Sequence, residues 1–404
     1  MISIFKDIEI KEFDSSKTSK NYLVLYHGRI FEINSLVKSV VEYVKQGKTE
    51  NEIAETISKN ENISLTENHI QQIKENIIQK ISSDNENSIV DSIYFKIKFI
   101  SPKVVKVISS CLTFFFNKFI FIFLNILFVL VFILIAPIIF AKSDLSNPNN
   151  FFPSILLTTS MILFHEIGHS TAIEKFNLKQ EAIGFGFYFF SPVFYTNSTQ
   201  AWMLDRKRRL IIDYGGIYFQ TLLLIPLGIY FYFSKDLLVK NIITYNYIII
   251  YLNLNPFLKF DGYWIFSDLI GVPNLRQKSS GFLLKLFQKY FLRKNIQLSF
   301  LEGLKKPVRY AFLFYVIIVN IFFGYFIFYL LPFFLVSFAN EVIHNFSAFQ
   351  ESLVSLIMFK NLWLNANIFF SYIIKCGLIL FYIIFLWKLL IRVYVLLKVN
   401  FKVK

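Results

Sequence analysis

The feature that most constrains this chain is a series of long apolar runs in its second half. Between Leu112 and Lys404 these runs reach about 18 to 28 residues, and none of that length occurs before Lys98. A helix of about 20 apolar residues crosses the ~30 Å hydrocarbon core of a bilayer. The pattern therefore predicts a mainly α, polytopic membrane protein with a small soluble N-terminal part.

Six apolar runs are long enough to be expected as transmembrane helices. They cover residues 111–141, 151–176, 210–233, 242–270, 310–336 and 370–390. Lysine and arginine are distributed unevenly between the connecting segments. Segments 178–209, 271–309 and 388–404 hold 5, 9 and 5 of them, whereas 142–150, 234–240 and 338–369 hold 1, 2 and 1. Cytoplasmic loops carry the excess of cations, so both termini are expected in the cytoplasm.

The charge of the chain is divided between its two parts. Residues 1–90 hold 11 Lys or Arg and 14 Asp or Glu, whereas residues 91–404 hold 31 and 13. The net charge of +15 thus belongs to the membrane part, where the orientation rule explains it. This argues against nucleic acid as a partner and leaves the lipid bilayer. The two cysteines, Cys111 and Cys376, suggest no disulfide framework.

The N-terminal part, residues 1–90, is expected to be a small winged-helix-like α+β domain followed by a linker. Residues 21–33 predict a β-hairpin turning at His27-Gly28, and an amphipathic helix from Ser35 to Gly47 follows. Two capping-box patterns then predict two further helices. The patterns are Thr49 with Glu52 and Ser64 with Glu67.

The stretch FHEIGHS, residues 164–170, places two histidines and a glutamate inside an apolar run. His165 and His169 are four residues apart, so on a helix both imidazoles lie on one face and can hold Zn²⁺. Glu166 is then placed to act as a general base on a water molecule. A carboxylate in hydrocarbon costs several kcal/mol, which favours a functional reading over a chance match.

A catalytic zinc usually has three protein ligands, so a third is expected from another span. Residues 253–264, NLNPFLKFDGYW, contain Asp261 after a helix break at Asn255-Pro256. Both spans run from outside to inside, and counting 1.5 Å per residue lets Asp261 reach the depth of His165. The alternative is that Asp261 is an interfacial carboxylate paired with Lys259.

HEIGH on one span and NPFLKFDG on a later one resemble the site-two protease family of intramembrane zinc metalloproteases. The resemblance covers about residues 110–276, with Phe260 where the family commonly has Leu. It implies zinc held by His165, His169 and Asp261, with Glu166 activating water. Residues 184–202 and 260–276 resemble the branch of bacterial peptide zinc metalloproteases linked to maturation and export of ribosomally made peptides. The expected location is then the bacterial inner membrane.

Two further residues are candidates for positioning a substrate. Gln220 matches the polar position of the family's Gly-x-x-x-Asn pattern, although Gly215 and Gly216 near it are also explained by helix packing through small residues. Asn255, at the helix break, is the second candidate. The aromatic segment 184–202 is expected either as a membrane-dipping β-element that pairs with an extended substrate or as an interfacial loop.

Residues 20–81 resemble PqqD-like domains, which hold leader peptides of ribosomally made natural products. The resemblance implies leader binding by strand addition. A DNA-reading winged helix and a purely structural cap are the alternatives, and the acidic balance of residues 1–90 speaks against the first.

The sequence therefore predicts an intramembrane zinc metalloendopeptidase that cleaves a peptide precursor or a single-span membrane substrate, with a peptide exporter as a further implied partner. A second hypothesis keeps the enzyme but makes its substrate a membrane-anchored regulator of the anti-sigma type. A third is a non-catalytic component of peptide export or immunity that retains the metal site.

Overall fold

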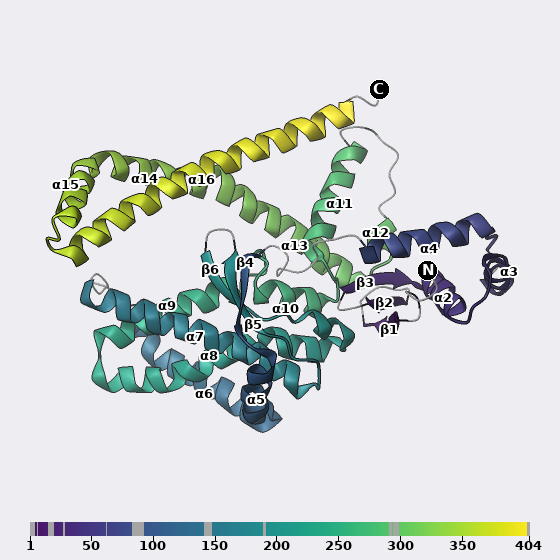
Figure 1. Cartoon of the computed structure of the whole chain (residues 1–404), viewed down its shortest axis with the longest axis horizontal. Coiled ribbons are helices and arrows are strands. Elements are labelled where there is room, and N and C mark those ends of the chain that lie inside the picture. The colour runs from purple at the N-terminus through teal and green to yellow at the C-terminus, as the bar shows by residue number, and fades with distance from the viewer. Residues whose placement is uncertain are drawn as a thin grey trace. The chain divides into compact units, whose positions relative to one another are not determined.

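The computed structural model is mainly helical, with two small antiparallel sheets (Figure 1). It describes residues 5, 7–14, 20–26, 29–61, 63–82, 93–140, 148–188, 191–290, 293 and 299–401. The chain forms two compact units, Met1–Leu313 and Phe314–Lys404. The predicted boundary after residue 90 falls in a segment outside the described residues and stays a prediction.

The N-terminal sheet has the strand order β1-β2-β3, with β1 Glu9–Phe13, β2 Asn21–Tyr26 and β3 Arg29–Asn34. The pairing of β2 with β3 confirms the predicted hairpin strands, and the register brings Tyr26 opposite Arg29. The predicted turn at His27-Gly28 lies outside the described residues. Strand β1 was not predicted, because EIKEF offers only two apolar residues and gains its place by pairing with β2.

Three helices follow the sheet: α2 Ser35–Lys45, α3 Glu50–Glu61 and α4 Glu67–Ser82. Their apolar faces and the sheet share one hydrophobic core, which includes Val40, Ile53 and Ile70. The order of strands and helices agrees with the predicted α+β part, and its winged-helix character stays a prediction.

The two predicted capping boxes have different outcomes. The Thr49 amide donates to Glu52 Oε2 at 2.9 Å and the Glu52 amide to Thr49 Oγ1 at 3.4 Å, so this box is confirmed. The third predicted helix is present as α4, which begins at Glu67, but Ser64 does not cap it, because Thr66 is the residue before the helix. The Leu65 amide donates to Ser58 Oγ on α3 at 3.0 Å, which holds residue 65 outside the helix.

Four helical stretches of the described residues are long and apolar enough to cross a membrane. They are Lys118–Ile139 (α6), Arg206–Ser234 (α8), Lys306–His344 and Ile368–Lys388. They correspond to the first, third, fifth and sixth predicted spans. Helices α7 Pro148–Lys175 and α9 Leu237–Asn253 occupy the second and fourth but are not among the four. Helix α9 has 17 residues, about 25 Å of helix, and α7 carries the polar motif.

Two predicted spans are interrupted. The first was expected to be continuous from Cys111, but α5 Pro102–Leu112 and the 3₁₀ turn η2 Thr113–Phe116 precede α6. Asn117 ends that turn, and its side chain caps α6 by accepting from the Phe119 amide at 3.1 Å. The fourth contains the break expected at Asn255-Pro256, after which α10 Asp261–Ile270 begins.

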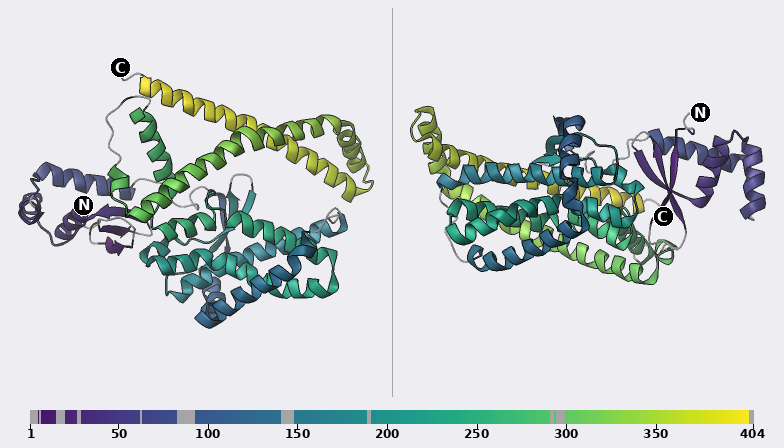
Figure 2. Two further views of the ribbon diagram at one scale, coloured as in Figure 1. Left: turned by 180° about the vertical axis from the view of Figure 1, so that it is seen from behind. Right: turned by 90° about the horizontal axis from the view of Figure 1, so that it is seen from below.

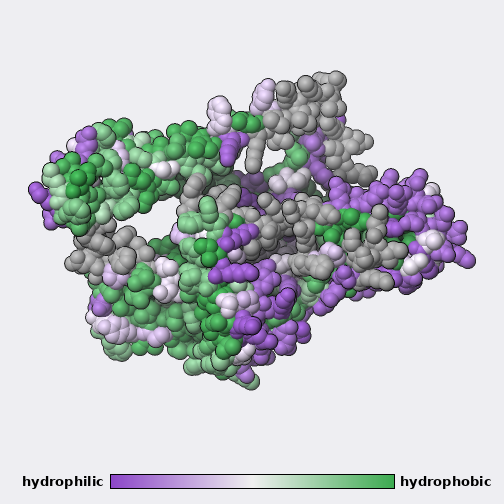
Figure 3. Space-filling view, viewed as in Figure 1, coloured by the Kyte–Doolittle hydropathy of each residue, from purple (hydrophilic) through white to green (hydrophobic). Residues whose placement is uncertain are grey.

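Helices α6, α7, α8 and α9 form a bundle in which α8 contacts the other three (Figures 1 and 2). Helix α7 approaches α8 closely at Gly168, where a Cβ atom would lie 2.3 Å from the carbonyl oxygen of Gly215. This confirms packing through small residues at Gly215. Helix α6 also carries exposed apolar side chains: Phe119, Phe123 and Ile133 are 83%, 63% and 60% exposed. Hydrophobic side chains cover much of this bundle in Figure 3, a surface suited to lipid.

The second sheet has the order β4-β5-β6, with β4 Ile93–Ile100, β5 Ile183–Tyr188 and β6 Ser191–Tyr195. The β-element expected within 184–202 is therefore present, and the 3₁₀ turn η3 Thr199–Met203 follows it. Strand β4 was missed, although IYFKIKFI alternates in a strand-like way. Strand β6 is an edge strand and contains Pro192, a residue that sheets tolerate at edges.

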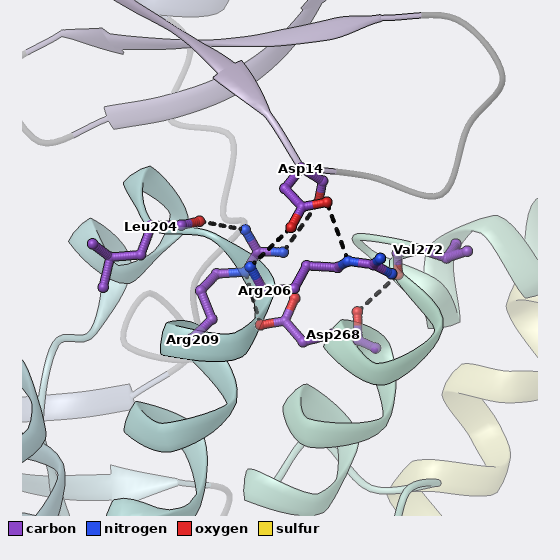
Figure 4. A network of polar contacts seen from close by, with 7 residues as sticks. Asp14, Leu204, Arg206, Arg209, Asp268 and Val272 are labelled. Carbon is purple, nitrogen blue, oxygen red and sulfur yellow. Dashed lines mark hydrogen bonds and ion pairs between the residues drawn. The ribbon is translucent and has the colours of Figure 1, made fainter. Parts of the chain in front are cut away.

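A buried ion pair joins the start of α8 to the end of α10. Arg209 Nε donates to Asp268 Oδ2 at 2.8 Å, and the two side chains are 2% and 9% exposed (Figure 4). Asp14, just after β1, pairs with Arg206 Nε at 3.2 Å in the same network. This network fastens α10 to the helix bundle two turns after Asp261.

The remaining helices lie after residue 271. They are α11 Leu275–Tyr290, α12 Ser299–Glu302, α13 Lys306–Tyr325, the π-helical turn η4 Phe326–Leu330, α14 Leu331–His344, α15 Phe346–Ile357 and α16 Leu362–Phe401. Helix α11 lies within the cation-rich connecting segment 271–309. The loop expected at 338–369 is instead largely helical, because α15 packs its aromatic side chains on α16: Phe349 stacks on Tyr372 with ring centroids 4.2 Å apart.

Candidate metal centre

The centre begins with three neighbouring side chains of α7. His165, Glu166 and His169 are only 4%, 9% and 8% exposed. The two histidines are one helical turn apart, and their Nε2 atoms are 3.2 Å from each other. The helix thus presents two imidazole nitrogens to one point inside the bundle, as the spacing predicted.

Asp261, the first residue of α10, brings a carboxylate to the same point. Its Oδ2 lies 3.0 Å from His165 Nε2, and its Oδ1 lies 3.4 Å from His169 Nε2. One ligand atom from each of the three residues lies within 4.8 Å of the other two. The structure therefore places the two separated motifs together, and the Asp261 carboxylate faces the two histidines.

The turn between the end of α9 and the start of α10 determines the position of Asp261. The Asn255 side chain is part of this turn, since its Oδ1 accepts from the Phe257 amide at 2.8 Å. Gly262 allows the chain to fold back, because a Cβ atom there would lie 2.2 Å from the carbonyl oxygen of Leu254. Asn255 thus helps to form the turn, and the substrate contact predicted for it stays a prediction.

The three donors fit zinc. Ligands at about 2.0–2.2 Å from a tetrahedral Zn²⁺ lie roughly 3.3 Å from one another, close to the observed separations. His169 Nδ1 lies 2.7 Å from the carbonyl oxygen of Ile212, which can only accept a hydrogen bond. Nδ1 therefore carries the proton of the neutral ring, and Nε2 keeps the lone pair that a metal needs.

Helix α8 leaves room for an ion beside the histidines. A Cβ atom on Gly216 would lie 2.4 Å from Nε2 of both His165 and His169. Any side chain at this position would occupy the place toward which the two nitrogens point. The predicted role of Gly216, helix packing, is thus only part of its contribution, because the glycine also keeps the centre open.

Glu166 lies beside the three ligand residues. Its carboxyl group is close enough to interact electrostatically with both histidines and with Asp261. The Thr196 hydroxyl, just after strand β6, donates to the Glu166 backbone carbonyl at 3.2 Å. The edge strand of the second sheet therefore ends next to the candidate general base.

Gln220, on α8, is fully buried and belongs to a polar chain behind His165. Its Oε1 lies 3.3 Å from His165 Nδ1, and its Nε2 donates to Asn246 Oδ1 on α9 at 2.7 Å. The substrate contact predicted for Gln220 stays a prediction. Asn246 was missed by sequence reasoning, although a carboxamide inside an apolar helix was an available signal.

No family model and no solved structure matches this chain. A curated protein of Bacillus subtilis (strain 168), the "Putative peptide zinc metalloprotease protein YydH", is 32% identical to it over 108 residues. These residues are 26% of this chain and 42% of that protein, so the similarity spans less than half of the relative. The chain is similar in part to a protein whose name describes a peptide zinc metalloprotease.

Proposed function

We propose that this protein is an intramembrane zinc metallopeptidase that hydrolyses a peptide bond in a membrane-associated peptide precursor. The observation that carries the proposal is the convergence of His165, His169 and Asp261, with Glu166 buried beside them. Burying ionisable side chains in a helix bundle of this kind costs free energy, so such side chains usually serve a function. The name of the partial relative supports the metal and the reaction class.

Each residue has a role in this proposal. His165 Nε2, His169 Nε2 and one Asp261 carboxylate oxygen hold the zinc ion. Zinc, when bound there, polarises the scissile carbonyl and lowers the pKa of a water molecule. The Glu166 carboxylate accepts a proton from the attacking water and later returns it to the leaving amine. The surrounding helices α7, α8 and α9 exclude lipid from these groups.

The second sheet offers a way to hold the substrate. Strand β6 pairs only with β5 among the described residues, so its other edge is open. Directly after this strand, the Thr196 hydroxyl donates to the backbone carbonyl of Glu166. An extended peptide that adds to this edge would be aligned by main-chain hydrogen bonds next to the centre. This supports a substrate that unfolds locally before cleavage.

The N-terminal domain supports the choice of a peptide precursor. Its three-stranded sheet has two edges, and strand addition to such an edge is a general way of binding an extended leader. We further propose that the protein crosses the bacterial inner membrane six times with both termini in the cytoplasm, where a newly made precursor would meet residues 1–90.

The first test measures zinc bound per purified full-length chain, for the wild type, Asp261→Ala and the control Asp205→Ala. Asp205 is an exposed aspartate that pairs with Arg208. We expect about one zinc in the wild type and in the control, and much less in Asp261→Ala. A wild type that binds no zinc after reconstitution would overturn the proposal.

The second test separates a peptidase from a scaffold. Glu166→Gln keeps the size of the side chain but removes the base, so precursor processing in cells should fall by at least about 10²-fold while zinc binding stays. Cross-linking this variant in cells should then trap the uncleaved substrate. Unchanged processing would favour the non-catalytic hypothesis, and a trapped membrane-anchored regulator would favour the anti-sigma hypothesis.

A further inference from the structure

In the buried polar chain from His165 through Gln220 to Asn246, the donors and acceptors can be assigned by starting from Asn246. Asn246 Nδ2 donates to the backbone carbonyl of Ile242 at 2.8 Å. That carbonyl can only accept, so the amide side of Asn246 must point toward it. The Asn246 Oδ1 atom is then the one that faces Gln220.

The orientation of Asn246 determines that of Gln220. Asn246 Oδ1 requires a donor, and Gln220 Nε2 provides one at 2.7 Å. The other end of the Gln220 carboxamide, Oε1, therefore faces His165 Nδ1 at 3.3 Å. An acceptor at this distance requires the proton of the neutral imidazole to be on Nδ1.

We infer that Gln220 and Asn246 are positioning residues that keep His165 in the tautomer able to bind a metal, with the Nε2 lone pair turned toward Asp261. The inference rests on the zinc centre of the proposed function. Both residues are fully buried, so the chain is shielded from solvent that could reorient it. The same reasoning gives His169 its tautomer from the Ile212 carbonyl, so each histidine has its own acceptor.

The inferred tautomer also bears on Asp261. Its Oδ2 is buried and lies 3.0 Å from His165 Nε2. With the proton on Nδ1, Nε2 would have none to donate to this carboxylate, so both atoms would present lone pairs to the space between them. Such a pair needs a cation between them, which is what the polar chain prepares.

The test measures the affinity of the purified full-length protein for Zn²⁺ by competition with a chelator. Gln220→Met keeps the length of the side chain and removes the acceptor, and we expect about 10- to 100-fold weaker binding. Gln220→Glu removes the donor to Asn246 Oδ1 but keeps an acceptor for Nδ1–H, and because the tautomer depends on that acceptor, binding should return to within about tenfold of the wild type. Asn246→Leu frees Gln220 to turn over and should weaken binding by an intermediate factor.

Thr221→Val is the matched control, because Thr221 is equally buried in α8 and its hydroxyl donates to the Tyr218 carbonyl of the same helix. Its zinc affinity should equal that of the wild type. Equal affinities for the wild type and Gln220→Met would overturn the inference and leave the proposed function intact. Loss of zinc from the wild type would overturn both. If Gln220→Met does not fold, Asn246→Leu decides by the same criterion.

Discussion

At the scale of single residues, the centre depends on what is absent from α8 as much as on its ligands. Gly216 lies against both imidazoles, and the helix backbone leaves that place free of side-chain atoms. Alanine at this position adds one carbon atom where the zinc ion and its ligand atoms should lie. The effect on the metal should therefore be large even though no ligand changes.

We expect Gly216→Ala to abolish stoichiometric zinc binding, because its Cβ would lie 2.4 Å from both Nε2 atoms and would push the rings apart. Zinc per chain measured on the purified protein checks this. Gly281→Ala in α11 is the control, since no atom lies within 4 Å of a Cβ built there. A full zinc complement in Gly216→Ala would show that the bundle is looser here than described.

At the scale of elements, the short helix α10 must be held still for Asp261 to reach two residues of α7. Its C-terminal end is fastened to α8 by the buried Arg209–Asp268 pair, and its N-terminal end by the turn at Gly262. Buried pairs contribute little net energy while intact, but breaking one leaves an uncompensated charge. Removing the Asp268 carboxylate, which pairs with Arg209, therefore tests how α10 is anchored.

Asp268→Ala should destabilise the protein by about 3–5 kcal/mol, because it leaves Arg209 buried without its carboxylate. Denaturant unfolding in detergent measures the loss. Asp205→Ala removes an exposed ion pair, in which Arg208 is 58% and Asp205 47% exposed. This variant should lose only about 0–1 kcal/mol of stability. Equal losses in the two variants would contradict a special role of the buried pair.

The contact between α3 and α4 has a predictable pH dependence. The Lys74 ammonium donates to the Glu50 carboxylate and lowers the pKa of Glu50 below its ordinary 4.5. The stabilisation is therefore present above pH 4.5 and is lost as the pH falls through the lowered pKa. Protection of α3 amides from hydrogen exchange should therefore stay constant above about pH 4.5 and fall below it, and it should fall less in Glu50→Gln.

Glu55→Gln is the control for that measurement, because Glu55 is exposed on the same helix. This variant should keep the acid sensitivity of the wild type. An acid response in Glu50→Gln equal to that of the wild type would assign the loss of protection to other carboxylates of the domain.

At the scale of the whole molecule, the question is whether α7 and α9 cross the membrane together with the four longer apolar stretches. Both helices lie in the bundle beside α8; α7 carries His165 and His169, and α9 carries Asn246 of the polar chain behind them, so we expect both helices to cross. Reporter domains inserted at 142–150 and at 178–209 should then report opposite sides of the membrane, the second being cytoplasmic. Reports from the same side would exclude α7 as a span.

Much of the site could be predicted because its signals are local. Residues four apart on a helix share a face whatever surrounds them, which is why His165 and His169 could be assigned together. Asn255-Pro256 ends a helix through backbone chemistry alone, and long apolar runs become helices because lipid offers no other partner for the backbone. Such features depend on neighbours in the chain, so the sequence is sufficient for them.

Packing between distant segments decided the rest. Ser64 does not cap helix α4 as its pattern suggests, and the neighbouring Leu65 amide donates instead to Ser58 of another helix. Strand β4 acquires its role by pairing with β5, about 90 residues away in the sequence. Asn246 reaches His165 only through Gln220 of a third helix, and Gly216 matters only because two imidazoles lie against it. These relations arise from which helix faces meet, and no pattern within one segment specifies that.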